Sequence, residues 1–471
     1  MNDSSCASTG TESGDDDSSA ADNSPTDPRN VSGPRNLGDG SATKHRATVD
    51  DTEKPAMAAP SKPSTGGIRS GWRHTFSSLK HRDFFLLWLG MLAMMGGMQM
   101  QMLARGYLVY DLTDSASLLG VVNAASSLPM LTLALFGGAA ADRVERKRLI
   151  QIGQGVAGML AVVVAFAIYK DAIEWWHLTL AALVQGTAFA FMMPARQAII
   201  PQLVDKGELT NAMAINAAGM SVTTLLAPAI AGGLYALVGP APVYFVIGGM
   251  GVLSVVATST IKPHPARATA RKPAMMRDIK EGLSYVRGNR LVLVLLFLGL
   301  ATSVLAMPFR FLMPVFIVDI YHLGPDSMGL LVAIMGGGSL VGSLLIASTG
   351  AWKRGLLLIL GSLASGIALL LIALIPLYSA AAVIMILLGL GDSSRRTLNQ
   401  SLIMEEVDDA YRGRVMSIFM MNFGLTPFGV LPAGIVSDWL GGQWAIGMLA
   451  VLLLVVSAVV WATQKRLREI D

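Results

Sequence analysis

Hydrophobic and polar positions alternate along this chain in long blocks. Residues 1–78 are polar and rich in Ser, Asp, Pro, Gly and Thr, whereas the rest of the chain consists of apolar runs separated by short polar breaks. A helix needs about 20 apolar residues to cross the hydrocarbon core of a bilayer. Twelve runs are candidates for such helices, at 83–110, 117–140, 148–169, 175–200, 208–238, 242–261, 291–318, 327–350, 355–376, 379–403, 415–437 and 442–463.

The runs predict helices rather than strands. Lipid leaves unpaired backbone groups unsatisfied, and these runs lack the strict alternation of strands in a membrane barrel. We therefore predict an all-α integral membrane protein with twelve transmembrane helices. The longest break, at 262–290, predicts a cytoplasmic linker between two six-helix bundles, at 79–261 and 291–463, and residues 464–471 form a short cytoplasmic tail.

The polar head of the chain predicts a different kind of structure. Residues 1–78 contain too little apolar surface to offset the entropy of ordering a chain, so we expect a disordered cytoplasmic tail. No signal peptide precedes the first apolar run, which begins near Phe84, and we expect that run to be an uncleaved anchor. The stretch GWRHTFSSLKHRD, residues 71–83, mixes aromatic residues with bases and predicts a short interfacial helix.

Basic residues gather in alternate breaks, and this sets the expected orientation. The breaks on the opposite side contain Lys170 as their only base. The positive-inside rule then places both termini in the cytoplasm, in a multi-pass protein of the plasma membrane. The bases that carry this prediction are Arg143, Arg146, Lys147, Arg148, Lys262, Arg267, Arg271, Lys272, Arg277, Lys280, Arg287, Arg290, Lys353, Arg354, Arg412, Arg414, Lys465, Arg466 and Arg468.

Composition excludes several function classes. Hydrophobic residues make up 53% of the chain, charged residues 14%, and the net charge is +4, which does not favour nucleic-acid binding. The one cysteine, Cys6, rules out an internal disulfide and disfavours a cysteine-ligated metal. A GxxxxGK phosphate loop, a nucleophile–base pattern and metal-ligand spacing are absent from the sequence. We predict no enzyme activity, no cofactor and no metal, and we expect a monomer.

The two predicted bundles carry weakly similar stretches in the same order. MLARGYLVYDLTDSASLLG in the first corresponds to AMPFRFLMPVFIVDIYHLGPDSMGLL in the second, and PARQAIIPQLV corresponds to SRRTLNQSLIM. Paired repeats of this kind are typical of secondary transporters.

The stretch FGGAAADRVERKRL, residues 136–149, resembles the loop signature of the major facilitator superfamily. Glu145 stands where the superfamily usually has glycine. YLVYDLT, PARQAIIPQLV and RGRVMSIFMMNFGLTPFGVLPAGIVSD resemble its drug:proton antiporter branch, which includes macrolide-efflux and enterobactin-export proteins. The resemblance covers nearly all of the chain after the tail. The positions that match the loop signature are Gly138, Asp142, Arg143, Arg146, Lys147 and Arg148.

This resemblance implies a cytoplasmic gate in which the loop aspartate meets the start of the eleventh predicted helix, the run at 415–437. Here Asp142 would meet YRGRVMS, whose free N–H groups carry the positive end of a helix dipole. Arg412 and Arg414 lie in that segment, and Arg414 is a candidate partner of Asp142. The alternative is a solvated basic loop that only fixes topology.

The fifth run carries TTLLAPAIAGGL, which resembles the antiporter motif of the superfamily. Pro228, Gly232 and Gly233 are retained, and Ala227 replaces the glycine that usually precedes the proline. The motif favours exchange transport, and the alternative is a proline-kinked packing helix. Small residues in GGAAA and GGGSLVGS predict close helix packing.

The first run carries a regular stripe. Met94, Met98, Gln101 and Arg105 recur at spacings of four, three and four, so they share one helix face. Methionine is flexible and polarisable, which suits a wall that contacts varied apolar substrates. The resemblance implies a substrate cavity between the bundles, lined by the first, fourth, seventh and tenth of the twelve predicted helices. The alternative is core packing or lipid contact.

Charges inside the runs are costly, so each predicts a function or a partner. Arg105 and Arg310 come late in their helices; they are expected to snorkel outward or to pair with Asp111, Asp114 or Asp319, and the alternative is contact with an anionic substrate. Asp392 lies well inside the tenth run. It is a candidate proton carrier and cavity residue, or it forms an intrahelical ion pair with Arg395 or Arg396.

The sequence thus predicts a secondary active transporter whose partners are a small-molecule substrate, protons and the lipid bilayer. We expect proton-coupled export of amphipathic compounds such as drugs, macrolides or siderophores. Uptake remains an alternative direction, and a non-transporting membrane sensor or scaffold is the alternative function.

Overall fold

The computed structural model describes residues 79, 81–203, 209–261, 275–349 and 353–470. Side chains at 134–135, 138–139, 141–143, 197–198, 200–203, 209–210, 275–280, 409–410 and 423 also lie outside the description. The predicted tail therefore falls outside the described residues, and so does most of the predicted interfacial helix. Residues 82 and 83 of that segment belong to the first long helix.

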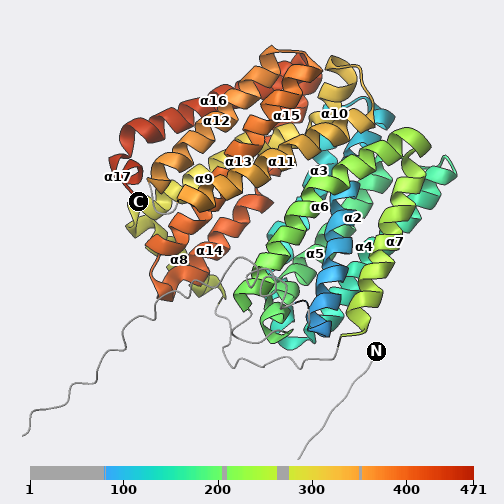
Figure 1. Cartoon of the computed structure of the whole chain (residues 1–471), viewed down its shortest axis with the longest axis horizontal. Helices are drawn as coiled ribbons and strands as arrows, with labels where there is room; N and C mark the ends of the chain where they lie inside the picture. The colour runs from blue at the N-terminus through green and yellow to red at the C-terminus, as the bar shows by residue number, and fades with distance from the viewer. Residues whose placement is uncertain (1–78, 80, 204–208, 262–274, 350–352, 471) are drawn as a thin grey trace, which may run out of the picture. The chain divides into compact units, whose positions relative to one another are not determined.

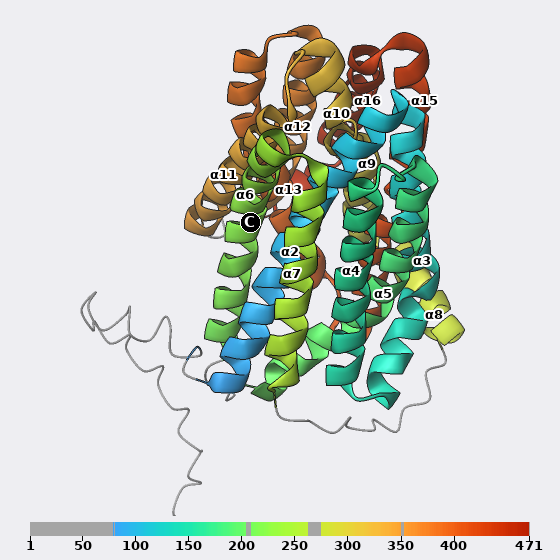
Figure 2. The ribbon, with the colours of Figure 1, turned by 90° about the vertical axis from the view of Figure 1, so that its right-hand side faces the viewer.

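The described chain is helical, and we call the helices before residue 262 the N half and those after residue 288 the C half (Figure 1). The N half consists of α2 (Arg82–Thr113), α3 (Ala116–Arg143), α4 (Arg146–Tyr169), α5 (Trp175–Leu203), α6 (Leu209–Val238) and α7 (Pro240–Ser259). Figure 2 shows α2, α4, α5 and α7 running beside one another, and contacts join α2 to α7, α4 to α7 and α4 to α5.

The C half begins after a helix in the predicted linker, α8 (Met275–Gly288), which packs on α14. One crossing of the C half is divided where Pro308 and Pro314 interrupt backbone hydrogen bonding, and another is divided before Pro427. The elements are α9 (Arg290–Phe311), α10 (Met313–Val315), the π-helical turn η3 (Phe316–Ile320), α11 (Pro325–Thr349), α12 (Arg354–Leu374), α13 (Tyr378–Glu406), α14 (Asp409–Gly424), α15 (Pro427–Leu440), α16 (Gly442–Thr463) and α17 (Lys465–Arg468).

Eleven segments of the described chain are long and apolar enough to cross a membrane, one fewer than the twelve runs of the sequence. The exception is α13, which is 29 residues long. Its length suffices for a crossing, but Asp392, Arg395 and Arg396 lower the hydropathy of its second half. The helix that departs from the apolar pattern therefore brings charge into the bundle.

The ends of the helices define two ends of the bundle. We call the end where α2 begins and α3 ends the basic end, and the end where α2 ends and α3 begins the far end. Local capping fixes some boundaries: Ser115 accepts a hydrogen bond from the N–H of Leu118 at the start of α3, and Asn289 caps α9 in the same way. Gly441, with φ of 93°, makes the left-handed turn between α15 and α16.

Candidate functional site

The two halves meet along two helix pairs, α6 with α11 and α3 with α15. Glycines allow both approaches. A Cβ on Gly232 would lie 2.3 Å from the carbonyl oxygen of Pro325, and a Cβ on Gly434 would lie 2.5 Å from that of Ala116. The fifth-run motif therefore lies at the contact between the halves, with Pro228 and Gly232 facing α11 and Gly233 in open space.

The polar contacts that the structure describes between the halves include a group at the far end. The carboxylate of Asp438, near the end of α15, accepts hydrogen bonds from the N–H groups of Ala116 at 2.6 Å and Ser117 at 2.9 Å, and from Ser115 Oγ at 3.0 Å. These donors form the start of α3, where free N–H groups and the helix dipole favour an anion. Tyr110 of α2 donates to Asp319 of η3. We call these contacts of Asp438 and Asp319 the far-end latch.

A cavity of about 380 Å³ lies between the halves, on the basic-end side of the latch. Its walls come from α2, α6, α9, α11 and α13. Methionines provide much of the apolar surface, and serine and threonine residues of α6, α11 and α13 contribute hydroxyl groups to the lining. The lining residues are Met95, Met98, Gln99, Met220, Ser221, Thr223, Thr224, Arg310, Met335, Gly336, Ser339, Leu340, Ser343, Asp392, Ser393, Arg396 and Thr397.

The charges of the cavity come from the C half. Asp392 pairs with Arg395 one turn away, and with Arg396 at 2.9 Å. The side chain of Arg395 is 8% exposed, that of Asp392 20% and that of Arg396 41%. The intrahelical ion pair that the spacing of α13 offered as one alternative is therefore present. Two guanidinium groups stabilise the charged form of this carboxylate.

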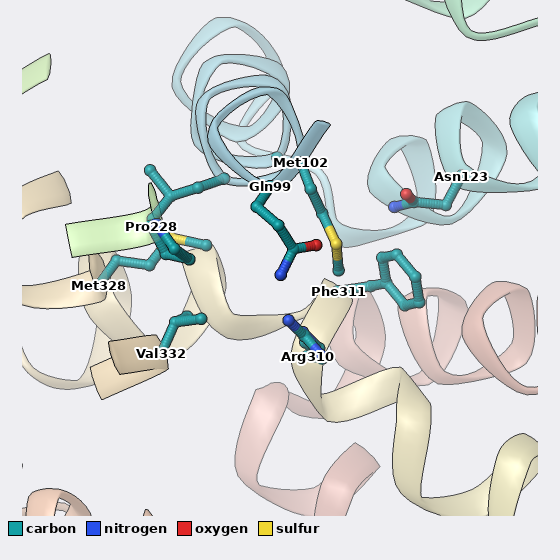
Figure 3. A pocket seen from close by; sticks show the side chains of 10 residues that line it. Gln99, Met102, Asn123, Pro228, Arg310, Phe311, Met328 and Val332 are labelled. Carbon is teal, nitrogen blue, oxygen red and sulfur yellow. The ribbon is translucent and has the colours of Figure 1, made fainter. Parts of the chain in front are cut away.

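Arg310 is the third cation of this region. It projects between the cavity and a smaller pocket of about 20 Å³, toward Gln99 (Figure 3). Asp392 and Arg396 lie within electrostatic range of its guanidinium. Among the described residues, Arg310 has neither a hydrogen-bond partner nor an ion-pair partner, and the expected pairing with Asp319 is replaced by the bond between Asp319 and Tyr110.

The stripe on α2 divides between two environments. Arg105 Nη1 donates to Gln185 Oε1 of α5 at 3.4 Å, and Gln185 Nε2 donates to Gln101 Oε1 at 2.6 Å. Met94, Met98 and Gln101 border a pocket of about 10 Å³ between α2, α4, α5 and α7. Of the stripe, Met98 reaches the large cavity, while Met94, Gln101 and Arg105 face the interior of the N half. Met95 and Gln99, which the stripe omits, line the cavity instead.

The residues proposed for the basic-end gate are only partly described. Lys147 donates to the carbonyl oxygens of Ser259 and Ile261 at the end of α7, and Arg148 pairs with Glu145 at 2.9 Å. Arg414 pairs with Glu281 of α8 at 3.0 Å. Arg146 and Arg412 also have partners among their surroundings. The surroundings of Gly138 and the side chains of Asp142 and Arg143 fall outside the description, so the contact expected of Asp142 stays a prediction.

Several residues of the site could not be predicted from the sequence. Asp438 belongs to the break SDWLGG, where an acid before a turn has no special pattern; its partners lie more than 300 positions earlier. Gln185 carries no signal either, because a single glutamine in an apolar run is common. In the described part of the chain, no group of His, Cys, Asp and Glu side chains is arranged to hold a metal ion.

Comparison of the amino-acid sequence with those of known proteins identifies relatives of this chain. The chain is 27% identical to macrolide efflux protein A of Streptococcus pyogenes over 323 residues, which cover 66% of this chain and 79% of the relative. It is 25% identical to the staphyloferrin A transporter of Staphylococcus aureus over 320 residues, with the same coverage of both chains. It is also 25% identical to the multidrug efflux pump Tap of Mycobacterium tuberculosis over 347 residues, covering 71% and 82%.

Solved structures share the fold at low sequence identity. The nucleoside transporter NupG superposes with a TM-score of 0.62 at 14% identity, covering 82% of this chain and 99% of that one. A bacterial homologue of the human lysosomal transporter Spinster, in an inward-facing and unoccupied conformation, gives 0.66 at 14% identity, covering 82% and 98%. The family model of the Major Facilitator Superfamily matches residues 87–430. This chain therefore belongs to the Major Facilitator Superfamily and is a multi-pass secondary transporter, not an enzyme.

Proposed function

We propose that this protein exports amphipathic small molecules across the plasma membrane by alternating access, driven by the proton gradient. The observation that carries the proposal is the 380 Å³ cavity between the halves, which has the far-end latch on one side. A transporter of this kind needs a binding space that one end of the protein closes while the other end opens. Drug-sized ligands occupy pockets of roughly 300–1,000 Å³.

The direction of transport follows from the orientation that we propose. The bases at the basic end assign it to the cytoplasm, with both termini on that side and the far end outside. In this orientation the latch closes the cavity toward the outside, so the cavity is ready to receive a molecule from the cytoplasm or from the inner leaflet. Two of the relatives are efflux proteins, one for macrolides and one for several drugs, and this supports export over uptake.

The latch supplies a place where protons would act. Asp438 binds the start of α3 only while the far end is closed, because its donors belong to the opposite half. Protonation removes the charge that the helix dipole attracts, so external protons favour opening. Asp392 was the other candidate for coupling. Its two arginine partners favour a fixed ion pair, which we propose as its role.

The basic end needs a counterpart to this latch when the far end opens. Asp142 at the end of α3 and the start of α14 are the proposed partners, with Arg412 and Arg414 beside them. Arg414 would then exchange Glu281 for Asp142 as the basic end closes. The two ends would in this way use the same chemistry, an aspartate against the start of a helix.

Substrate-dependent proton movement in everted membrane vesicles tests the proposal. Vesicles are energised to an acidic interior, and a panel that includes macrolides and staphyloferrin A is added while a pH-sensitive dye reports proton release. We expect release that depends on the protein and on the compound. Asp438→Asn should lower it several-fold while substrate binding persists. Asp171→Asn, at an exposed turn of the same end, is the matched control and should behave as the parent.

Each alternative predicts another result. Accumulation that continues after the pH gradient is collapsed contradicts proton coupling. Accumulation in the opposite direction indicates an uptake transporter. A protein that moves no compound of the panel and releases no protons fits a membrane sensor or scaffold.

A further inference from the structure

Charge is distributed unevenly around the cavity between the halves. Its charged lining residues are two cations, Arg310 and Arg396, and one anion, Asp392. Asp392 is already paired with Arg396 and with Arg395. With Arg395 included, three arginines face one carboxylate, and Arg310 is the one of the three that has no hydrogen-bond or ion-pair partner among the described residues.

An arginine in this position is costly without a partner. Arg310 lies inside a membrane helix, where a cation costs several kcal/mol unless it is paired or hydrated. Arg105, the arginine at the corresponding place in the N half, is half-buried and donates a hydrogen bond to Gln185. Arg310 differs from it because its guanidinium borders two open spaces, the cavity and the small pocket of Figure 3. The structure thus presents a cation to whatever molecule enters.

The remaining walls accept an apolar body. Met95, Met98, Met220 and Met335 come from three helices and line one cavity, and their flexible thioethers adapt to varied shapes. A guanidinium binds a carboxylate through two parallel hydrogen bonds, which are stronger than bonds between neutral groups. The cavity combines these two features within about 380 Å³.

We propose that this cavity selects amphipathic anions, whose carboxylate binds Arg310 and whose apolar part packs against the methionines. This inference rests on the proposed export function, because it assumes that the cavity is the transport site. The proposal narrows the substrate class from amphipathic compounds in general to those that carry a carboxylate or a similar anionic group.

Three probes with one fluorophore test the charge preference. N-dansylglycine carries a carboxylate, N-dansylglycinamide is neutral and N-dansylethylenediamine is a cation. Binding to the full chain in phosphatidylcholine nanodiscs is measured by equilibrium dialysis, with empty nanodiscs as the blank. We expect the carboxylate to bind at least about tenfold more tightly than the amide, as a hydrogen bond to a charged group predicts. The cation should bind most weakly.

Substitutions of Arg310 test whether this residue causes the preference for the carboxylate probe. Arg310→Gln should reduce carboxylate binding to the level of the amide and leave amide binding unchanged, whereas Arg310→Lys should retain most of the preference. Arg466→Gln, at a mostly exposed arginine, is the matched control and should bind all three probes as the parent does. The lysine variant separates loss of charge from loss of folding.

Two outcomes overturn the proposal. One is a parent protein that binds the cation or the amide as tightly as the carboxylate, or that binds no carboxylate. The other is an Arg310→Gln variant that binds the carboxylate as well as Arg310→Lys does. The vesicle assay separates these results from a failure of export, because a protein that moves other compounds with protons remains an exporter even when the anion preference is absent.

Discussion

The N half and the C half use the same packing for different chemistry. α3 packs on α5 as α11 packs on α13, and α4 packs on α7 as α12 packs on α16. The polar groups inside the two halves do not correspond in the same way. The N half holds two cations away from the surface, the half-buried Arg105 beside the neutral amides of Gln101 and Gln185, and Arg196 of α5, which is 9% exposed. The C half holds the carboxylate of Asp392 among three arginines and faces the cavity with it.

This difference shows which parts of a repeated fold are constrained. Helix packing depends on small residues at the crossing points, and both halves provide them. A Cβ on Gly186 of α5 would lie 2.1 Å from the carbonyl oxygen of Ser126, and a Cβ on Gly389 of α13 would lie 2.1 Å from that of Met335. Polar side chains are free to differ once the backbones fit. The charged residues that line the cavity, Arg310, Asp392 and Arg396, therefore all belong to the C half.

The largest effect is expected from removing the carboxylate of the C half. Asp392→Asn leaves Arg395 and Arg396 without their anion, and breaking such a pair costs about 3 kcal/mol of unfolding free energy, the lower end of the range for buried pairs because Asp392 is partly exposed. Thermal unfolding of the purified variant should show the loss. Asp171→Asn, at an exposed turn, serves as the control.

Transport by the same variant separates the two roles of Asp392. A stable variant that binds substrate but loses proton-driven accumulation would identify Asp392 as the coupling group, against our expectation. Normal stability together with normal transport would reject both roles.

The shared packing is tested at equivalent crossings. Gly389→Ala and Gly186→Ala place a methyl group against a carbonyl oxygen of the neighbouring helix, so a helix must move, at a cost of about 1–3 kcal/mol each. Gly233→Ala is the control, since its Cβ meets no atom within 4 Å and alanine favours a helix. Thermal unfolding measures all three. A large cost in one half and none in the other would contradict the equivalence of the crossings.

An effect of similar size is expected from the polar cluster of the N half. Gln185→Leu removes the acceptor of Arg105 and the donor to Gln101, and unsatisfied buried groups cost about 1–3 kcal/mol. The preference for the anionic probe should not change, because Gln185 lies outside the large cavity. Gln151→Leu, which loses a bond to Ser259 near the surface, is the control. A changed probe preference would show that the N-half cluster takes part in substrate selection.

No effect on transport is expected from deleting residues 1–70. Their composition predicts no helix packing, so neither half loses a contact. Vesicle transport, normalised to the amount of protein in the membrane, measures this. Complete loss of transport at a normal amount would contradict the prediction.

Features that depend on neighbouring positions in the chain were available from the sequence. Apolar runs predict the crossing helices, because every backbone polar group in lipid must be bonded within its own segment. The pairing of Asp392 with Arg395 and Arg396 was one of two predictions from their spacing, since residues three and four apart meet on one helix face. The close helix approaches at Gly137 and Gly338 were predicted in the same local way, because these glycines lie in the small-residue stretches GGAAA and GGGSLVGS.

Only the tertiary structure decided which helix faces meet and which side chains lie across from them. The spacing on α2 places Met94, Met98, Gln101 and Arg105 on one face, but the direction of that face depends on how α2 is rotated against α5 and α7. The rotation turns Gln101 and Arg105 into the N half and Met95 and Gln99 toward the cavity. Asp438 reaches the start of α3 across more than 300 positions, a proximity set by packing between the halves.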